Sequence, residues 1–179
     1  MRIIAGEFKG RRLKTPRWEG LRPTSDKLRE TLFNIIAARV AGARVLDVFA
    51  GTGAVALESI SRGAELAVCI ESDRRARALI AENAALCGAR DRCVIIRDTA
   101  ARALHKPIAG DPFELIIVDP PYDFEPLTPL LTACTAHLAS GGLLVLEHAR
   151  RQAVPASVAV RRIRLVTSGD SALTFFEAS

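Results

Sequence analysis

Short apolar runs alternate with stretches of helical periodicity along most of the chain. The expected strands are residues 44–49, 66–70, 94–96, 113–118 and 143–147, and the expected helices are residues 54–62, 73–87 and 126–138, with a short helix that ends near Leu104. Strands that alternate with helices are typical of a parallel sheet covered by helices. Residues 158–166 and 172–176 are two more strand-like runs, close enough to form an antiparallel hairpin. The pattern predicts an α/β fold: a doubly wound, mostly parallel, seven-stranded sheet with a C-terminal β-hairpin.

The first residues follow a different pattern. Residues 2–5 and 11–16 suit two short strands or an arm, and Gly6 and Gly10 lie where a hairpin could turn. A helix is expected after Arg22-Pro-Thr-Ser-Asp26, where Thr24 or Ser25 can cap the free N–H groups. Its buried face is expected to contain Leu28, Leu32, Ile35, Ile36 and Val40. We therefore divide the chain into an N-terminal basic hairpin or arm, residues 1–24, and a larger domain, residues 25–179.

The composition indicates the class of protein and its cellular compartment. The 179 residues are 49% hydrophobic and 25% charged, as in an ordinary globular domain. The four cysteines have no C-x-x-C spacing, which favours reduced thiols in the core of a cytoplasmic protein over zinc ligands or disulfides. No apolar run reaches the roughly 18 residues of a membrane helix, so no membrane segment is expected.

The net charge of +5 is concentrated at one end. Residues 1–30 hold nine Lys and Arg against four Asp and Glu, whereas residues 31–179 hold sixteen of each. A local basic segment favours a polyanionic partner, with nucleic acid first among the candidates. We expect Arg11, Arg12, Lys14, Arg22 and Arg29 to contact phosphates, and the side chain of Arg29 to face a ligand on the open side of its helix.

A nucleotide site is expected after the strand at residues 44–49. Gly51 and Gly53 follow that strand directly and let a ligand approach the backbone at a helix N-terminus. Glu71, about 20 residues further on, suits the ribose hydroxyls of NAD or of S-adenosylmethionine equally. Asp47 favours a ligand with a cationic ammonium or sulfonium, because a carboxylate repels a pyrophosphate. Asp98 could accept a hydrogen bond from an adenine amine, cap the next helix, or do both.

Asp119-Pro-Pro-Tyr122 is the most specific motif of the chain. Two prolines fix the backbone and present carbonyl oxygens without competing N–H donors, and an ionised Asp119 only accepts hydrogen bonds. These acceptors suit an exocyclic amine whose nitrogen gains positive charge as it attacks a methyl group. Tyr122, the only tyrosine, offers a flat ring for a base lifted out of its stack.

Taken together, these motifs resemble those of class I S-adenosylmethionine-dependent methyltransferases, and more closely those of the RsmD family. The resemblance is carried by Asp47-Val-Phe-Ala-Gly-Thr-Gly53, Glu71, Asp119-Pro-Pro-Tyr122, Met1-Arg-Ile-Ile-Ala-Gly6, Lys9-Gly-Arg11, Arg22-Pro-Thr-Ser-Asp26, Arg29-Glu30, Leu32-Phe-Asn-Ile35, Leu57-Glu58, Ser61-Arg-Gly-Ala64 and Glu147-His148. That family methylates the N2 amine of one guanine in bacterial small-subunit (16S) ribosomal RNA. Ala56, where a glycine is usual, and Ser168, where a tyrosine is usual before the glycine, depart from the family pattern.

The resemblance implies a site and its partners. The implied catalytic residues are Asp119, Pro120, Pro121 and Tyr122; the cofactor-binding residues are Asp47, Phe49, Ala50, Gly51, Thr52, Gly53, Glu71, Ser72, Asp98 and Thr99; the RNA-binding residues are Arg11, Arg12, Lys14, Arg22, Thr24 and Arg29. The implied cofactor is S-adenosylmethionine, with no metal, and the implied partner is 16S ribosomal RNA, either free or in an assembling small subunit. Adenine-N6 methylation, an NAD-dependent oxidoreductase, and an RNA-binding or assembly protein without chemistry are the alternatives left open.

Overall fold

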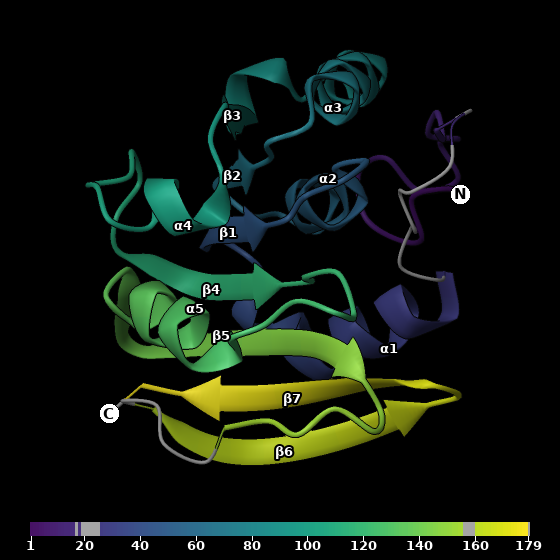
Figure 1. Cartoon of the computed structure of the whole chain (residues 1–179). Coiled ribbons are helices and arrows are strands. Elements are labelled where there is room, and N and C mark those ends of the chain that lie inside the picture. The colour runs from purple at the N-terminus through teal and green to yellow at the C-terminus, as the bar shows by residue number, and fades with distance from the viewer. Residues whose placement is uncertain (17, 19–25, 156–159, 179) are drawn as a thin grey trace.

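The computed structural model of the chain describes residues 1–16, 18, 26–155 and 160–178. The helices are α1 (Asp26–Ile36), α2 (Ala54–Ser61), α3 (Arg74–Cys87), α4 (Ala100–Ala103) and α5 (Leu127–Thr135), with 3-10 turns η1 (Ala37–Arg39) and η2 (Arg90–Arg92). The strands are β1 (Arg44–Val48), β2 (Leu66–Ile70), β3 (Cys93–Ile96), β4 (Phe113–Val118), β5 (Leu138–Ala149), β6 (Arg161–Ser168) and β7 (Ser171–Glu177) (Figure 1). None of the helices in these described ranges is both long enough and apolar enough to cross a membrane.

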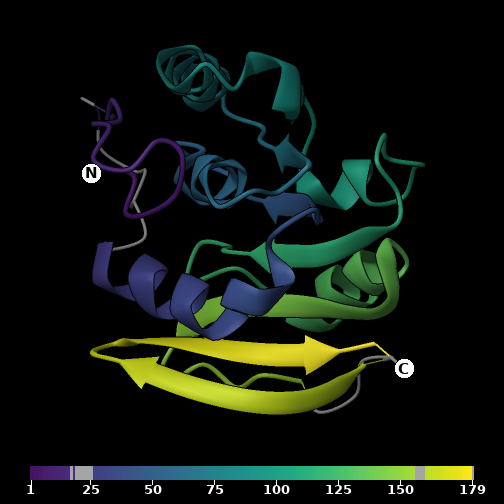
Figure 2. The same cartoon turned by 180° about the vertical axis from the view of Figure 1, so that it is seen from behind.

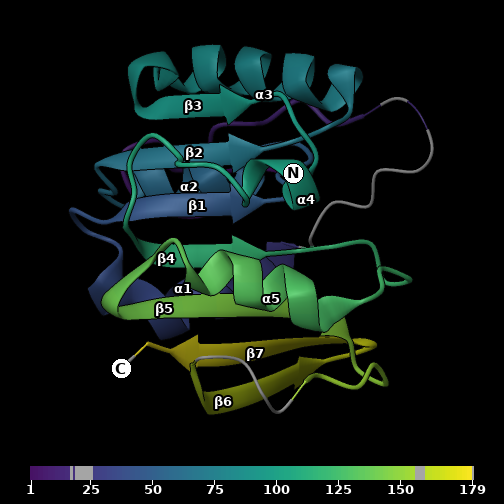
Figure 3. The same cartoon turned by 60° about the vertical axis from the view of Figure 1, so that its left-hand side comes forward.

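The strands form one sheet in the order β3-β2-β1-β4-β5-β7-β6. The strands β1 to β5 pair in parallel, and β7 pairs antiparallel with both β5 and β6 (Figure 3). This confirms the predicted mostly parallel seven-stranded sheet and its C-terminal hairpin. The order reverses between β1 and β4, so the carboxyl ends of these two strands flank the position where open α/β sheets bind ligands.

Each face of the sheet is covered by its own helices. Apolar side chains of α1, α2 and α3 pack with alternate residues of the strands, such as Val45 and Ile117, in one core. Those of α4 and α5 pack with the intervening residues, such as Leu46 and Ile116, in the other. Figures 1 and 2 show the two helix layers from opposite sides. Strands buried on both faces explain why the chain carries continuous apolar runs in place of strict alternation.

The N-terminal segment, residues 1–16, is packed against the domain. An isolated antiparallel bridge joins Arg2 to Arg12, and Ile3, Phe8 and Leu13 are buried in the same core as α1, α2 and α3. The segment, called the N-terminal hairpin below, turns back on itself and lies on α2 and α3, and this isolated bridge stands in place of the two expected short strands. The boundary proposed after residue 24 lies outside the described residues, as does the proposed helix cap at Thr24 or Ser25.

Two buried groups of α2 hold this segment in place. The carboxylate of Glu58 accepts hydrogen bonds from the N–H groups of Ile4 (2.7 Å) and Ala5 (3.0 Å). Ser61 accepts one from the N–H of Phe8 and donates one to the carbonyl of Ala5. A Cβ at position 6 would lie 1.8 Å from the Ser61 carbonyl oxygen, and Gly6 has a φ of +83°, so this crossing requires glycine.

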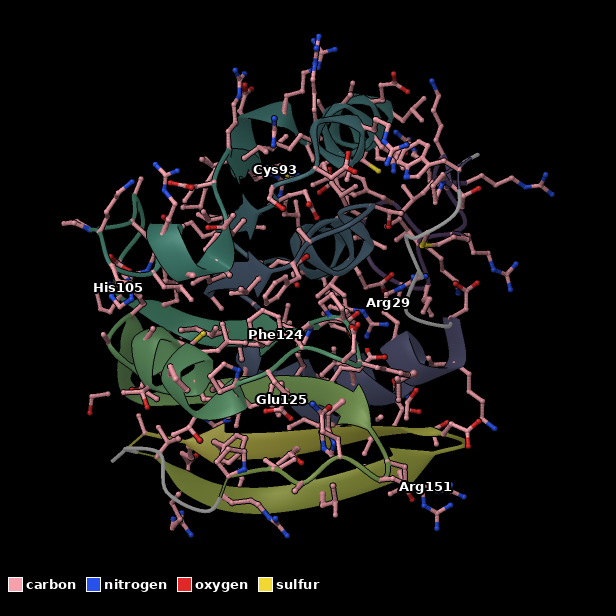
Figure 4. All side chains as sticks on the ribbon, in the orientation of Figure 1. Arg29, Cys93, His105, Phe124, Glu125 and Arg151 are labelled. Atoms are coloured by element: carbon pink, nitrogen blue, oxygen red, sulfur yellow. The ribbon has the colours of Figure 1, made fainter. Side chains whose placement is uncertain are left out.

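The expectation that Arg29 faces a ligand is wrong. Its side chain is fully buried between α1, α2 and the N-terminal hairpin (Figure 4), where it donates to the carbonyl of Arg2 (2.5 Å) and to Asp26 (3.0 Å). Its Nε lies 3.9 Å from a carboxylate oxygen of Glu58. The periodicity of α1 placed Leu28 and Leu32 correctly, but a buried cation paired with an acid from another helix leaves no signal in that periodicity.

The end of α5 and the start of β5 also differ from expectation. The helix ends at Thr135, not at Leu138, and β5 begins at Leu138, five residues before the expected start. The pairing of β4 with β5 shifts between Phe113 and Leu115, and Gly141 has a φ of +67°. An irregular strand that continues through Gly141-Gly142 looks like a turn in the sequence, since glycine pairs punctuate most chains.

Replacing Glu58 with alanine is expected to loosen the N-terminal hairpin. The change leaves the N–H groups of Ile4 and Ala5 without their acceptor and removes the acid facing the buried Arg29, so we expect the free energy of unfolding to fall by about 3 kcal/mol. Urea unfolding measures this loss, and hydrogen exchange should be faster at Ile4 and Ala5. Glu65→Ala, at an exposed carboxylate, is the matched control. Unchanged exchange at Ile4 and Ala5 would contradict the role of Glu58.

Candidate functional site

The candidate site lies where β1 and β4 end side by side. The N–H groups of Phe49 and Ala50 donate to the carbonyl of Ile70, at the end of β2. The N–H of Asp119 donates to the carbonyl of Val48 at 3.2 Å. The glycine turn after β1 and the Asp119-Pro-Pro-Tyr122 segment after β4 therefore start next to each other.

The turn from β1 into α2 has an unusual backbone. Phe49, Gly51 and Gly53 all have positive φ (68°, 55° and 74°), and Phe49 is the only described non-glycine residue with this sign. A Cβ at position 53 would lie 3.0 Å from a side-chain carbon of Ile80 on α3. Close packing of α3 thus adds to the strain that any other residue would meet at Gly53.

Glu71 fastens this turn to the end of β2. One of its carboxylate oxygens accepts a hydrogen bond from the N–H of Gly51 (2.9 Å), and the other accepts one from the N–H of Asp73 (2.8 Å). Each oxygen keeps a second lone pair that can accept a bond from a ligand hydroxyl. Asp73 in turn caps α3 by accepting bonds from the N–H groups of Arg75 and Ala76.

Asp47 is buried beneath the turn. Its carboxylate accepts a hydrogen bond from the N–H of Ala56 at 3.1 Å, in the first turn of α2. The pKa of Asp47 is raised to about 7, chiefly because burial disfavours the charged carboxylate; the Ala56 bond opposes this rise, and the charges of Asp119 and Glu71 contribute to it. Three carboxylates thus meet at this edge of the sheet, and a cation bound among them would favour their ionised forms.

A cavity of about 190 Å³ opens beside Glu71. Its lining combines aromatic, acidic and small residues: Phe49, Ile70, Glu71, Ser72, Asp98, Thr99, Ala100, Ala101 and Phe124. The rings of Phe49 and Phe124 meet edge to face, with centroids 5.3 Å apart, and Figure 4 shows Phe124 near the centre of this side of the molecule. Two rings, a polar rim and an oriented carboxylate suit a nucleoside.

Asp98 does not cap α4. The N-cap is Thr99, whose side-chain oxygen accepts from the N–H of Arg102. Asp98 accepts a bond from the N–H of Thr99 and pairs with Lys106 (3.2 Å) and Arg102 (3.3 Å). Partial desolvation acts to raise the pKa of Asp98, but these bonds and charges outweigh it and the pKa is lowered. The carboxylate at the cavity is thus held in its ionised form.

The segment after β4 is fixed at both ends. Pro120 is buried, and the carbonyl of Pro121 accepts a bond from the N–H of Phe124 at 2.8 Å. The Tyr122 hydroxyl is hydrogen-bonded to the Ser171 hydroxyl at the start of β7. The hairpin that closes the sheet therefore positions the polar end of the tyrosine ring. Phe124 and Ser171 were both absent from the sequence-based site; an aromatic residue two positions after Tyr122 was the only available signal.

The expected RNA-binding residues have different surroundings. Arg11 and Lys14 are exposed, but both have partners within the protein. The Arg11 side chain donates a hydrogen bond to the carbonyl of Leu86, and Lys14 forms an ion pair with Glu82 at 2.9 Å. Arg12 is exposed. Arg29 is buried, as described above, and Arg22 and Thr24 lie outside the described residues.

The cysteines are free and buried, as expected: Cys69, Cys87, Cys93 and Cys134. Within the described ranges, no three His, Cys, Asp or Glu side chains gather into a group that could hold a metal ion.

Comparison with known proteins gives a consistent result. The sequence profile of the family described as Conserved hypothetical protein 95 matches residues 1–177. YlbH of Bacillus subtilis (strain 168), a candidate rRNA methyltransferase, is 36% identical over 161 residues, which cover 88% of both chains. Ribosomal RNA small subunit methyltransferase D of Escherichia coli (strain K12) is 41% identical over 122 residues, which cover 68% of this chain and 60% of that one.

A solved structure agrees with these sequence matches. The Escherichia coli protein yhhF, a candidate methyltransferase, superposes with a TM-score of 0.88 at 33% identity, and the match covers 100% of this chain and 98% of that one.

The raised pKa of Asp47 predicts a pH-dependent cost to stability. The folded protein keeps a proton that the unfolded chain releases above pH 3.8, so stability falls as pH rises from 3.8 to about 7 and is constant beyond it. Asparagine at position 47 cannot titrate. We therefore expect the unfolding free energy of Asp47→Asn, relative to wild type, to rise by about 2–3 kcal/mol between pH 5 and pH 8.

Urea unfolding at each pH measures this difference. Asp91→Asn, at an exposed carboxylate, should parallel wild type across the same range. A difference for Asp47→Asn that does not change with pH would show that Asp47 ionises normally in the fold.

Proposed function

The chain belongs to the RsmD family of S-adenosylmethionine-dependent ribosomal RNA methyltransferases, and on that premise we propose that it methylates the exocyclic N2 amine of one guanine in 16S ribosomal RNA. The observation that carries the proposal is the hydrogen bond from the Asp119 N–H to the Val48 carbonyl. This bond holds the Asp119-Pro-Pro-Tyr122 segment beside the turn after β1, which would hold the cofactor.

The residues around the cavity fit S-adenosylmethionine. Glu71 would accept hydrogen bonds from the ribose hydroxyls, Asp98 would face the adenine amine, and Phe49 and Phe124 would contact the adenine ring. Gly51 and Gly53 would let the backbone approach the ligand, and Asp47 would lie near its methionine part. When bound, S-adenosylmethionine supplies a methyl group activated by a positive sulfur.

The Asp119-Pro-Pro-Tyr122 segment would hold the base. The Asp119 carboxylate and the Pro120 carbonyl would accept the two N–H groups of the amine, which orients its lone pair. Their negative charge would stabilise the positive charge that develops on the nitrogen, and the proton would leave to solvent or by way of Asp119. Tyr122, held by Ser171, would stack on a base rotated out of the RNA.

Guanine is favoured over adenine by the acceptor at position 119. Guanine presents two adjacent donors, N1–H and the N2 amine, and a carboxylate only accepts hydrogen bonds. Adenine presents one donor beside an acceptor nitrogen, which a carboxylate would repel.

The proposal predicts a defined product. Incubation with unmodified 16S ribosomal RNA and labelled S-adenosylmethionine, followed by digestion to nucleosides, should give label in N2-methylguanosine. The same assay on the assembled small subunit would identify the preferred form of the substrate. Label in N6-methyladenosine would overturn the choice of base, and no transfer to either form would overturn the function.

Removing the acceptor at position 119 tests its role. Asp119→Ala should lower the rate of methyl transfer by about 10²-fold or more, because one charged acceptor is lost where charge develops. Binding of S-adenosylhomocysteine, followed by thermal shift, should persist and show that the cofactor site is intact. Asp123→Ala, at an exposed carboxylate of the same loop, is the matched control. A rate for Asp119→Ala within threefold of wild type would exclude the proposed contact with the amine.

A further inference from the structure

A second basic surface lies after β5 and along β6, the edge strand of the sheet. Residues 150–168 contain five arginines, Arg150, Arg151, Arg161, Arg162 and Arg164, and no Asp or Glu. All five are exposed, two directly after β5 and three on β6. The sequence balance over residues 31–179 is zero, which conceals this local excess.

Four of these arginines have no ion-pair partner among the described residues. Arg161 pairs with Glu177 at 3.1 Å, but Arg150, Arg151, Arg162 and Arg164 form no side-chain ion pair with any residue in the described part of the chain. By contrast, Arg11 and Lys14 of the N-terminal hairpin are bound to Leu86 and Glu82. Cations without internal partners remain available to an external anion.

The surface is joined to the candidate site at two points. The side chain of Gln152 donates to the carbonyl of Phe124, in the loop that carries Tyr122. The N–H of Arg150 donates to the carbonyl of Asp170 at 2.7 Å, next to Ser171, which binds the Tyr122 hydroxyl. These bonds connect the segment that carries Arg150 and Arg151 to the loop of Tyr122. Figure 4 shows Arg151 extending outward past the end of β5.

The outer strand favours an anionic partner over a second copy of this chain. The strand β6 is the last in the sheet order, and its Ile163 and Leu165 are 42% and 48% exposed. An edge with exposed apolar residues is open to pairing. Pairing with another β6 would place arginines of two copies close together, and facing like charges destabilise paired strands.

We propose that Arg150, Arg151, Arg162 and Arg164 bind phosphates of the RNA that flanks the target nucleotide. The inference rests on the proposed function and names a surface for its substrate on the opposite side of the site from the N-terminal hairpin. Arg162 and Arg164 lie toward the start of β6, opposite Phe176 and Phe175 of β7, whereas Ser168 at the end of β6 pairs with Ser171 next to the site. From residue 162 to residue 168 the strand extends about 20 Å, so RNA that reaches Arg162 from the site would follow it for several nucleotides. Such contacts position the RNA without reading its sequence.

The test is binding of a 16S ribosomal RNA transcript to the quadruple Arg→Gln variant at these positions, measured by filter binding over a range of salt concentrations. We expect affinity at about 0.1 M salt to fall at least tenfold, and the slope of log affinity against log salt to become shallower by about 3, since each lost phosphate contact removes about 0.7–0.9. The quadruple Arg→Lys variant should keep wild-type affinity within about threefold, because phosphate binding requires the charge.

Three controls keep the outcome interpretable. S-adenosylhomocysteine binding checks the fold of each variant, and Arg150→Gln with Arg151→Gln, which leaves β6 unchanged, replaces the quadruple variant if that variant aggregates. Arg151→Gln is compared with Arg90→Gln, an exposed arginine before β3 at the other edge of the sheet, which should bind RNA as wild type does.

The proposal is overturned if the Gln variants keep wild-type affinity and salt slope, or if the Lys variant loses as much as the Gln variant. Weaker methylation of the assembled subunit with unchanged binding of free RNA would assign the surface to an acidic protein partner and also overturn it. Failure of the wild-type protein to methylate RNA would instead count against the proposed function.

Discussion

The Glu71 carboxylate connects the parts on which the candidate site depends. It joins the glycine turn after β1 to the start of α3 through two backbone N–H groups, at 2.9 and 2.8 Å. The carbonyl of Ile70 supports the same turn through the N–H groups of Phe49 and Ala50. The positive φ of Phe49 in that turn costs free energy, and these bonds from the end of β2 offset part of the cost. The end of β2 therefore both shapes the turn and offers an acceptor to the ligand.

Charge is distributed in a way that matches two ligands of opposite sign. Asp47, Glu71 and Asp119 influence one another at the carboxyl edge of the sheet, where a cationic sulfur compound would relieve their repulsion. Exposed arginines lie on the two flanks, on the N-terminal hairpin and on the β5–β6 side. A polyanion that spans both flanks would pass over the acidic centre, where only a neutral base could approach closely. This separation favours a base extended out of its strand over a paired one.

The sequence was sufficient for the order of strands and helices, because strands buried on both faces give long apolar runs with glycines and acids at their ends. It was insufficient wherever two distant segments decide the outcome. Arg29 is buried because Glu58 and the Arg2 carbonyl surround it. The strand β5 continues across Gly141-Gly142 because β4 pairs with Leu138 before these glycines and with Leu143 after them. Phe124 joins the cavity through contact with Phe49, which lies 75 positions earlier. The motif residues could be identified, since glycine turns and proline pairs are visible in a short stretch of sequence. The residues that support them come from distant segments and leave no such local signal.

The docking of the N-terminal hairpin has a consequence for synthesis on the ribosome. The N–H groups of Ile4 and Ala5 find their acceptor 54 and 53 positions later, and the backbone of Lys14 finds Asn83 after 69 more residues. Residues 1–16 can therefore dock only after α2 and α3 have emerged. During that interval the apolar side chains of this basic segment, Ile3, Phe8 and Leu13, stay exposed to solvent. The hairpin thus takes its place only after the later helices that it contacts have been made.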